Sequence, residues 1–184
     1  MKLLFATTNI NKIREAEEIL GVEIEGVKLE IDEIQTLDPE KAVKEKAKRA
    51  YEQFGKPILV EDASLFFSAW NGLPGVYIDS FLESVDNEGL IKMLRHEKNH
   101  RAKAVVCLAI YNGKNCKVYK GEIKGKISSS PKGKSGFGWD PIFVPAGYNK
   151  TFAEMGIQEK NKISMRKLAL EKLKKDLIRI NKKK

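Results

Sequence analysis

The spacing of apolar residues predicts alternating strands and helices along most of the chain. Within residues 12–20, Ile13, Ala16 and Ile19 recur at the 3.6-residue period of a helix face. Residues 22–34 instead alternate apolar and acidic side chains, which is typical of a strand. The same criteria predict strands at 2–7, 22–34, 57–60, 102–111, 117–127 and 142–144, and helices at 12–20, 38–54, 86–94 and 160–180.

This order of elements, βαβαβ followed by a hairpin and a last helix, predicts an α/β fold with a mixed, twisted sheet and flanking helices. Asp38-Pro39 supports the second helix, because Asp caps a helix and proline suits its first position. No repeat, linker or composition break divides the chain. We therefore expect one α/β domain over residues 1–184, with a disordered basic tail at about 181–184.

Composition predicts a globular protein located in the cytoplasm. The chain has 184 residues, 42% of them hydrophobic and 32% charged, which is enough for one domain with a substantial core. No apolar run approaches the roughly 20 residues that span a bilayer, and the apolar start is shorter than the core of a signal peptide. Cys107 and Cys116 lack metal-ligand spacing, and a disulfide is not expected in the cytosol.

The net charge of +9 predicts an anionic partner: a nucleotide, a nucleic acid or an acidic surface. Much of the excess lies between Lys160 and Lys184, so a solvated basic helix accounts for part of it. A candidate anion site lies at the other end of the chain. Thr7-Thr8-Asn9, followed by Lys12, places hydroxyls, an amide and a cation at a helix N-terminus, where phosphate binds well. The alternative is a simple helix cap.

Glu61-Asp62 follows a buried strand and is predicted to lie at its carboxyl end. Carboxylates there favour a Mg²⁺ ion, which uses few carboxylates together with phosphates and water. A second acidic source, Glu30, Asp32 and Glu33, follows the second strand. Exposed acids at strand ends are common, so each alone also fits a plain surface role.

The run Gly136-Phe137-Gly138-Trp139-Asp140-Pro141 predicts a tight loop with a flat apolar face beside polar groups. A nucleobase fits such a face, and the alternative is a turn whose aromatic rings fill the core. Lys160 and Arg166 are predicted at the start of the last helix. Cations are disfavoured at that end of the helix dipole, which favours a functional role.

Five motifs in one order identify a family resemblance. They are Thr8-Asn9-x-x-Lys12, Glu61-Asp62-Ala63-Ser64-Leu65, Leu73-Pro74-Gly75-Val76-Tyr77, the loop at 136–141 and Lys160-Asn161-x-x-Ser164-x-Arg166. From about Leu3 to Leu170 the chain resembles the inosine triphosphate pyrophosphatase family. The resemblance implies a mixed sheet in two lobes with a central cleft, a homodimer, and Mg²⁺-dependent hydrolysis of ITP, dITP and XTP to the monophosphate and pyrophosphate. It implies no specific nucleic-acid partner and no membrane.

The resemblance also implies roles for individual residues. Glu33 and Asp62 would hold the metal, and Asp62 would orient or deprotonate the attacking water. The implied substrate-binding residues are Thr8, Asn9, Lys12 and Lys46 for the triphosphate, and Ala63, Phe137, Gly138, Trp139, Asp140, Lys160, Ser164, Met165 and Arg166 for the rest of the nucleotide.

Met165 departs from the family, which usually has histidine at this position. Methionine lacks a hydrogen-bond donor, so we expect activity to survive with weaker discrimination among purines. Ala63 replaces a common Ser or Thr, a milder change. Two other functions fit parts of the sequence: a Maf-like pyrophosphatase acting on other modified nucleotides, and a non-catalytic nucleotide or nucleic-acid binder. The Phe137-to-Asp140 loop argues against the first, and Asp62, Glu33 and Lys12 argue against the second.

Overall fold

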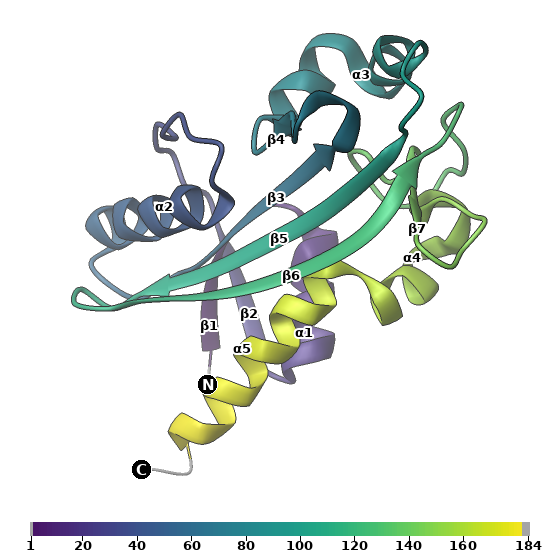
Figure 1. The fold of residues 1–184 in the computed structure, drawn as a ribbon. Helices are drawn as coiled ribbons and strands as arrows, with labels where there is room; N and C mark the ends of the chain where they lie inside the picture. Colours follow the sequence, from purple (N-terminus) through teal and green to yellow (C-terminus); the bar gives the residue numbers. More distant parts are fainter. Residues whose placement is uncertain (1, 182–184) are drawn as a thin grey trace. The chain divides into compact units, whose positions relative to one another are not determined.

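The computed structural model describes residues 2–181 (Figure 1). The strands are β1 (Lys2–Ala6), β2 (Glu23–Val27), β3 (Leu59–Phe67), β4 (Pro74–Gly75), β5 (Arg101–Tyr111), β6 (Cys116–Ile127) and β7 (Phe143–Pro145). The helices are α1 (Ile10–Leu20), α2 (Pro39–Phe54), α3 (Ile78–Leu94), α4 (Phe152–Ile163) and α5 (Met165–Asn181), with a 3-10 turn at Ser68–Trp70.

The strands form one mixed sheet in the order β2-β1-β3-β5-β6-β7, with β4 paired to β3. β1 runs parallel to β2 and β3, whereas the β3–β4 and β6–β7 pairs are antiparallel. The predicted α/β class with a mixed sheet is thereby confirmed.

The chain divides into two compact units. Unit 1 comprises Met1–Asp62, Val106–Gly121 and Arg166–Lys184, and unit 2 comprises Ala63–Val105 and Glu122–Met165. β3, β5 and β6 each contribute residues to both units. Because each unit is assembled from separated segments, no single linker or change of composition marks a boundary in the sequence.

The third strand is longer than the apolar run that predicts it. β3 continues through Glu61 and Asp62 to Phe67, so the prediction that these carboxylates lie at its carboxyl end is wrong. The strand extends because apolar residues return after the acids, with Leu65 and Phe67 buried. β2 is shorter than predicted and ends at Val27, which leaves Glu33 in the irregular segment that follows.

The predicted helix at 160–180 is two helices. α4 ends at Ile163 and α5 begins at Met165, because Ser164 between them is extended, with φ −66° and ψ 153°. Lys160 therefore lies in the last turn of α4, where the helix dipole favours a cation. Lys160 therefore does not lie at an unfavourable helix start, and that prediction is wrong.

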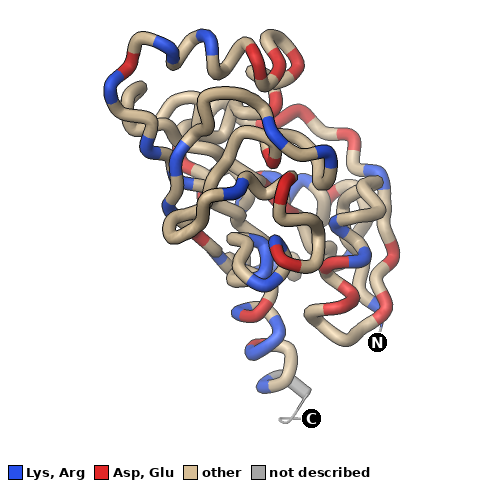
Figure 2. The backbone as a smooth tube through the Cα atoms, turned by 90° about the vertical axis from the view of Figure 1, so that its right-hand side faces the viewer, with Lys and Arg blue, Asp and Glu red and all other residues tan. Residues whose placement is uncertain are grey.

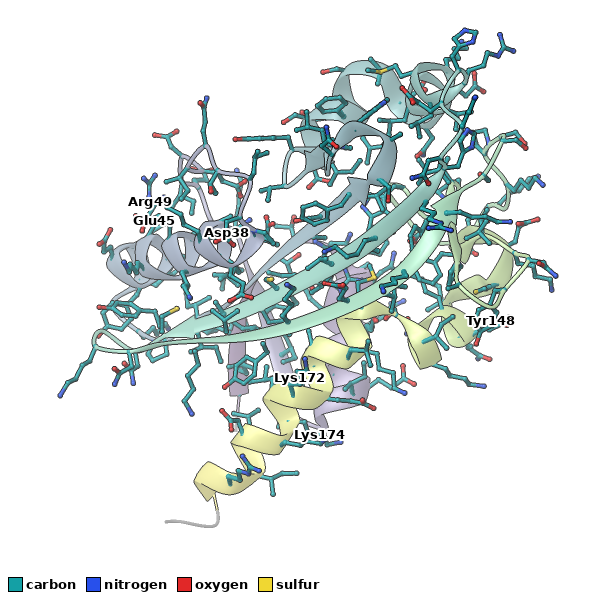
Figure 3. The ribbon with its side chains drawn as sticks, in the orientation of Figure 1. Asp38, Glu45, Arg49, Tyr148, Lys172 and Lys174 are labelled. Atoms are coloured by element: carbon teal, nitrogen blue, oxygen red, sulfur yellow. The ribbon has the colours of Figure 1, made fainter. Side chains whose placement is uncertain are left out.

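Two helices begin at side-chain caps: α2 starts as predicted, whereas α1 starts at Ile10, two residues before the predicted start. The Asn9 side chain accepts hydrogen bonds at the start of α1. The Asp38 side chain does the same for α2, accepting the N–H of Glu40 at 2.9 Å, and Pro39 follows at the first position (Figure 3). Both helices thus begin where a side-chain acceptor satisfies their first N–H groups.

α5 is attached to unit 1 by buried apolar residues and by lysines. Leu173 is fully buried, while Lys172 Nζ donates to the Lys120 carbonyl at 2.5 Å and Lys174 Nζ to the Ile19 carbonyl at 2.7 Å (Figure 3). Basic residues continue along the helix toward its C-terminal end (Figure 2). Lys172 and Lys174 therefore donate hydrogen bonds that hold the helix in place. The positive charge of this helix is thus not available in full for an anionic partner.

Three smaller predictions can also be compared with the structure. Of the predicted basic tail, residues 182–184 lie outside the described residues, whereas Asn181 ends α5. Cys107 and Cys116 are both free thiols in the structure. Across residues 2–181, no helix is long and apolar enough to cross a membrane.

Candidate active site

The N-terminus of α1 carries the first group of predicted substrate-binding residues, in unit 1. The side-chain oxygen of Asn9 accepts the N–H groups of Asn11 at 3.0 Å and Lys12 at 3.4 Å. The N–H of Asn9 donates to Thr7 Oγ1 at 3.1 Å. The cap therefore occupies two of the helix N–H groups that an anion would use. The amide nitrogen of Asn9 and the hydroxyl of exposed Thr8 remain as donors.

Lys12 belongs to a buried ion network within unit 1. Lys12 Nζ lies 3.0 Å from Glu61 Oε1. Arg166 binds both oxygens of Glu61, through Nε at 2.8 Å and Nη2 at 2.9 Å, and donates from Nη1 to Glu15 at 3.0 Å. Arg166 is 1% exposed, and Glu61 and Glu15 are each 5% exposed. Two cations thus balance two carboxylates, as buried charges require.

The network determines the charge state of Glu61. Burial by itself would raise the pKa of this carboxyl, but the positive charges of Arg166 and Lys12 outweigh burial and hold the pKa well below its ordinary value. The pKa of Arg166 is raised, because its carboxylate partners outweigh its own burial. Glu61 is therefore a permanent anion at neutral pH.

Glu33 and Lys46 meet beside the same helix N-terminus. Lys46 Nζ lies 2.6 Å from Glu33 Oε1, and the Glu33 side chain is 58% exposed. Both residues line a cavity of about 320 Å³ that also touches Thr7 and Thr8. A carboxylate, an ammonium group and two hydroxyls therefore line one cavity in unit 1. A phosphate and its counter-ion need groups of these kinds.

Asp62 lies next to Glu61 in β3 and is half-buried. Successive side chains of a strand point to opposite faces, so the two carboxylates do not form one pair. Glu61 turns to Arg166, which leaves Asp62 on the other face of the strand. Across residues 2–181, no three His, Cys, Asp or Glu side chains are grouped to hold a metal by themselves.

The loop at 136–141 in unit 2 folds around the carboxylate of Asp140. Asp140 Oδ2 accepts the N–H of Phe137 at 2.9 Å, and Lys160 Nζ lies 2.6 Å from the same oxygen. Gly136 has a φ of +81°, and a Cβ at this position would lie 2.2 Å from Asp140 Oδ2. The loop thus requires glycine at 136 for both backbone conformation and space.

The two aromatic rings of the loop have different environments. Trp139 is 6% exposed and packs 5.5 Å from Phe143 and 6.4 Å from Phe152, between ring centroids. Phe137 is half-buried, with Lys160 Nζ 4.6 Å from its ring centroid. Trp139 therefore fills the core, which is the alternative stated for this loop. Phe137 keeps an accessible surface, and its contact with a nucleobase stays a prediction.

The remaining predicted residues divide between the units. Ser164 is fully buried, and its N–H donates to the Lys160 carbonyl at 2.9 Å. Met165 is 2% exposed, and Ala63 is half-buried in β3. Arg166, which the resemblance assigns to the base pocket, uses three of its donor nitrogens on the two carboxylates of unit 1. Its contact with a base stays a prediction.

Two residues of these groups were missed by the sequence analysis. Glu15 pairs with Arg166, 151 positions away, and no local pattern links them. Asn87 donates to the Gly138 carbonyl at 2.9 Å and thereby holds the loop from α3. The sequence holds only a weak signal for Glu15: this acid lies beside the apolar face of α1, at a position that turns toward the core.

Replacing Gly136 by alanine is expected to destabilise the chain by about 2 kcal/mol more than Gly147→Ala, because only the first Cβ overpacks a carboxylate. Gly147 is the matched control: its φ is +86°, but a Cβ there meets no atom within 4 Å. Chemical denaturation measures both free energies of unfolding. Equal losses would mean that backbone strain alone, and not the Asp140 contact, requires glycine at position 136.

Sequence comparison relates the chain to proteins of known family. Residues 3–176 match the model of the Ham1 family. The chain is 43% identical over 176 residues to the dITP/XTP pyrophosphatase of Methanopyrus kandleri, covering 94% of both chains. It is 43% identical over 179 residues to the inosine triphosphate pyrophosphatase of Yarrowia lipolytica, covering 95% of this chain and 94% of the relative.

Solved structures agree with the fold. The HAM1 protein from Coxiella burnetii superimposes with a TM-score of 0.86 at 28% identity, covering 97% of this chain and 99% of the other. The Staphylococcus aureus Ham1 protein superimposes with a TM-score of 0.83 at 26% identity, covering 96% and 98%. Since one family model spans nearly the whole chain and relatives share over 40% of its residues, the chain belongs to the Ham1 family.

Proposed function

We propose that this chain is a nucleoside triphosphate pyrophosphatase that hydrolyses ITP, dITP and XTP to the monophosphate and pyrophosphate with Mg²⁺. Two similar relatives carry the names dITP/XTP pyrophosphatase and inosine triphosphate pyrophosphatase. The observation that carries the proposal is the site in unit 1, where cations, hydroxyls and carboxylates meet at a helix N-terminus beside a cavity. Removal of these nucleotides would keep the nucleotide pool free of deaminated purines.

The unit 1 residues suit a triphosphate. Lys12 and Lys46 supply positive charge, and Thr8 and Asn9 supply uncharged donors. Each lysine already has a carboxylate partner, at 3.0 and 2.6 Å. A triphosphate would share or displace these contacts, so the lysines are held in position before substrate arrives. Such preorganised cations stabilise the charge that builds on a leaving pyrophosphate.

Glu33 and Asp62 are the residues that would hold Mg²⁺. Their oxygen ligands suit this ion, which binds one or two carboxylates and completes its shell with phosphate and water. The lack of a larger acidic group within residues 2–181 fits a metal that arrives with the substrate phosphates. When bound, Mg²⁺ neutralises phosphate charge and orients the oxygens. Asp62 would accept the proton of the attacking water.

The unit 2 loop suits a 6-oxopurine. Hypoxanthine and xanthine carry an acceptor where adenine carries an amino donor. Lys160 is a donor held beside the ring of Phe137, so it would favour the oxo group and leave the adenine amino group without an acceptor. In a tight polar site, kcat/KM for a substrate whose polar group finds no partner can be lower by about 10⁴-fold.

A panel of nucleoside triphosphates with pyrophosphate detection tests the function. We expect pyrophosphate release from ITP, dITP and XTP with Mg²⁺, much slower release from ATP, and no release when the metal is chelated. Release of single phosphates instead of pyrophosphate, or preference for modified pyrimidine nucleotides, would contradict the proposal. The homodimer and the cytoplasmic location stay predictions.

Met165→His is expected to raise the ratio of kcat/KM for ITP over GTP by about five-fold, the worth of one added hydrogen bond. The physical reason is that Met165 is buried without a donor, whereas histidine brings one. Met165→Leu is the control, because it preserves volume and apolar character, and its ratio should match the wild type. An unchanged ratio in Met165→His would mean that this position does not read the base.

A further inference from the structure

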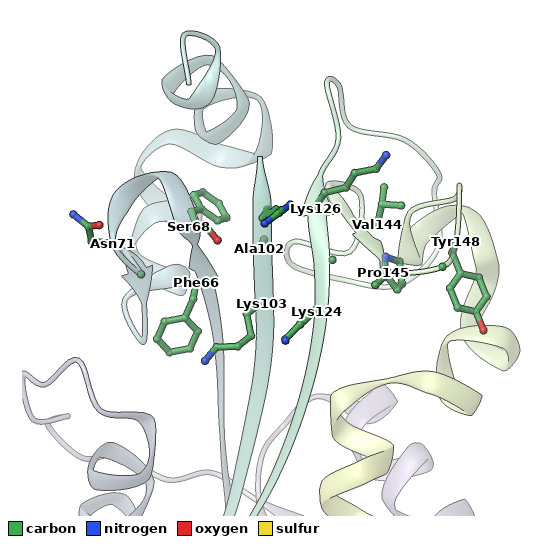
Figure 4. A pocket seen from close by; sticks show the side chains of 16 residues that line it. Phe66, Ser68, Asn71, Ala102, Lys103, Lys124, Lys126, Val144, Pro145 and Tyr148 are labelled. Atoms are coloured by element: carbon green, nitrogen blue, oxygen red, sulfur yellow. The ribbon is translucent and has the colours of Figure 1, made fainter. Parts of the chain in front are cut away.

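The outward sheet face of unit 2 carries four cations that the proposed hydrolysis does not use. Arg101 and Lys103 alternate in β5 with buried Ala102. Lys124 and Lys126 lie on the neighbouring strand β6. We call these four cations the basic strip. They line a cavity of about 940 Å³ that contains none of the residues assigned to the proposed hydrolysis (Figure 4).

The strand register sets these cations directly opposite one another. The N–H of Ile127 donates to the His100 carbonyl at 2.9 Å. In an antiparallel pair this bond sets Arg101 opposite Lys126, and the strip's two other lysines lie opposite each other two residues further along. Like charges directly opposite in a sheet are destabilising, unless an anion lies between them.

One carboxylate offsets part of this charge. Glu122 Oε2 lies 3.4 Å from Lys103 Nζ. Among the described residues that line the cavity, no Asp or Glu occurs, so with Glu122 beside it the strip keeps a charge of about +3. This surplus of positive charge would attract a multiply charged anion.

Aromatic rings flank the strip. Lys103 Nζ lies 5.2 Å from the ring centroid of Phe66 on β3. Tyr148, which follows β7, is 38% exposed. Figure 4 shows Phe66 and Tyr148 on opposite sides of Lys103 and Lys124. From β3 to β7 the groups therefore follow in the order ring, cation, cation, ring. The three strand spacings from β3 to β7 span roughly 14 Å.

This arrangement fits a strand of nucleotides. A mononucleotide has one base and cannot use both rings, whereas an oligonucleotide supplies bases to each side and phosphates to the cations between them. Single-stranded nucleic acid is commonly bound in this way, by a basic groove with aromatic rings on which bases stack. Ser68 and Asn71 add uncharged polar groups at the Phe66 side of the cavity, as partners for ribose hydroxyls.

We propose that the basic strip and its flanking rings bind single-stranded RNA without sequence preference. A second copy of this chain is a poorer occupant, since two basic strips facing each other would repel. The proposal does not depend on nucleotide hydrolysis, because its residues are separate from those of the candidate active site.

Fluorescence anisotropy with a labelled, unstructured RNA oligonucleotide and the full chain tests the proposal. The variant Lys103→Gln/Lys124→Gln removes two strip cations. Lys41→Gln/Lys56→Gln is the matched control, because it removes two exposed lysines of unit 1 and gives the same net charge. Thermal unfolding of each variant confirms that it is folded, and titrations at several salt concentrations give the salt dependence.

We expect saturable binding by the wild type and the control, and at least about ten-fold weaker binding by the strip variant. The slope of log K against log salt should fall by about 0.7 for each RNA phosphate that the variant no longer neutralises. Phe66→Leu should weaken binding without changing this slope, because it removes stacking only. Absent binding, equally weakened binding in both double variants, or equally tight binding of DNA of the same sequence would overturn the proposal. A change of oligomeric state in the strip variant with full RNA binding would overturn it too.

Discussion

Asp62→Asn is expected to lower the rate of pyrophosphate release from ITP by about 10³-fold, within the range found when a general base is removed. Asparagine has nearly the same shape but cannot accept a proton or neutralise a cation. Asp62 is half-buried on the face of β3 opposite Glu61, so the substitution leaves the buried ion network untouched. The loss should therefore be in kcat, with an unchanged thermal transition.

The control for this prediction is Asp32→Asn, an exposed carboxylate in the segment that contains Glu33. It removes one carboxylate charge between Ile31 and Glu33, which line the 320 Å³ cavity, but it has no assigned role, so its rate should stay within a few-fold of wild type. Full turnover by Asp62→Asn would refute the assigned mechanism. A loss of activity accompanied by unfolding would instead indicate a structural role for Asp62.

Arg166→Met is expected to destabilise the chain by about 3–5 kcal/mol, the usual cost of removing one partner from a buried ion pair. Arg166 is 1% exposed and neutralises Glu61 and Glu15, which are each 5% exposed. Without it, the network has two buried carboxylates and Lys12, whose Nζ lies 3.0 Å from Glu61. Denaturant unfolding at neutral pH measures the loss.

The destabilisation by Arg166→Met should shrink as the pH falls. In the wild type the pKa of Glu61 is depressed, so its contribution to stability is complete above the ordinary glutamate pKa of about 4.3 and declines below it. In the variant, burial of Glu61 is no longer outweighed by Arg166 and raises the pKa of this carboxyl, so that its protonation in mild acid relieves the buried charge. A gap between wild type and variant that stays constant from neutral to acidic pH would contradict this account.

Charge removal provides a second check. Adding Glu61→Gln to Arg166→Met should restore part of the stability, because one of the two buried carboxylates that have lost Arg166 is then uncharged. Double-mutant cycle analysis then gives a coupling energy well above the experimental error, as expected for residues in direct contact. Strictly additive losses would mean that Arg166 stabilises the unit by packing alone.

Local patterns were sufficient for most of the fold. The 3.6-residue spacing and the caps at Asn9 and Asp38 predict α1 and α2, because a helix start depends on a few neighbouring residues. The hairpin of β5 and β6 follows from a long apolar run and an alternating polar and apolar run, joined by a short turn at Asn112-Gly113. Failures occurred where a boundary depends on packing, at β3 and at the break between α4 and α5.

The sequence by itself determined the α/β class, the family resemblance and the chemical types available to the site, since these depend on residue identity and short-range spacing. Only the tertiary structure decided how those residues are used. It joined Arg166 to Glu61 and Glu15, which lie 105 and 151 positions away, and it turned Glu61 and Asp62 to opposite faces of β3. It also buried Trp139 and left Phe137 accessible. The physical reason is that burial and ion pairing depend on which distant segments meet, and no local pattern carries that information.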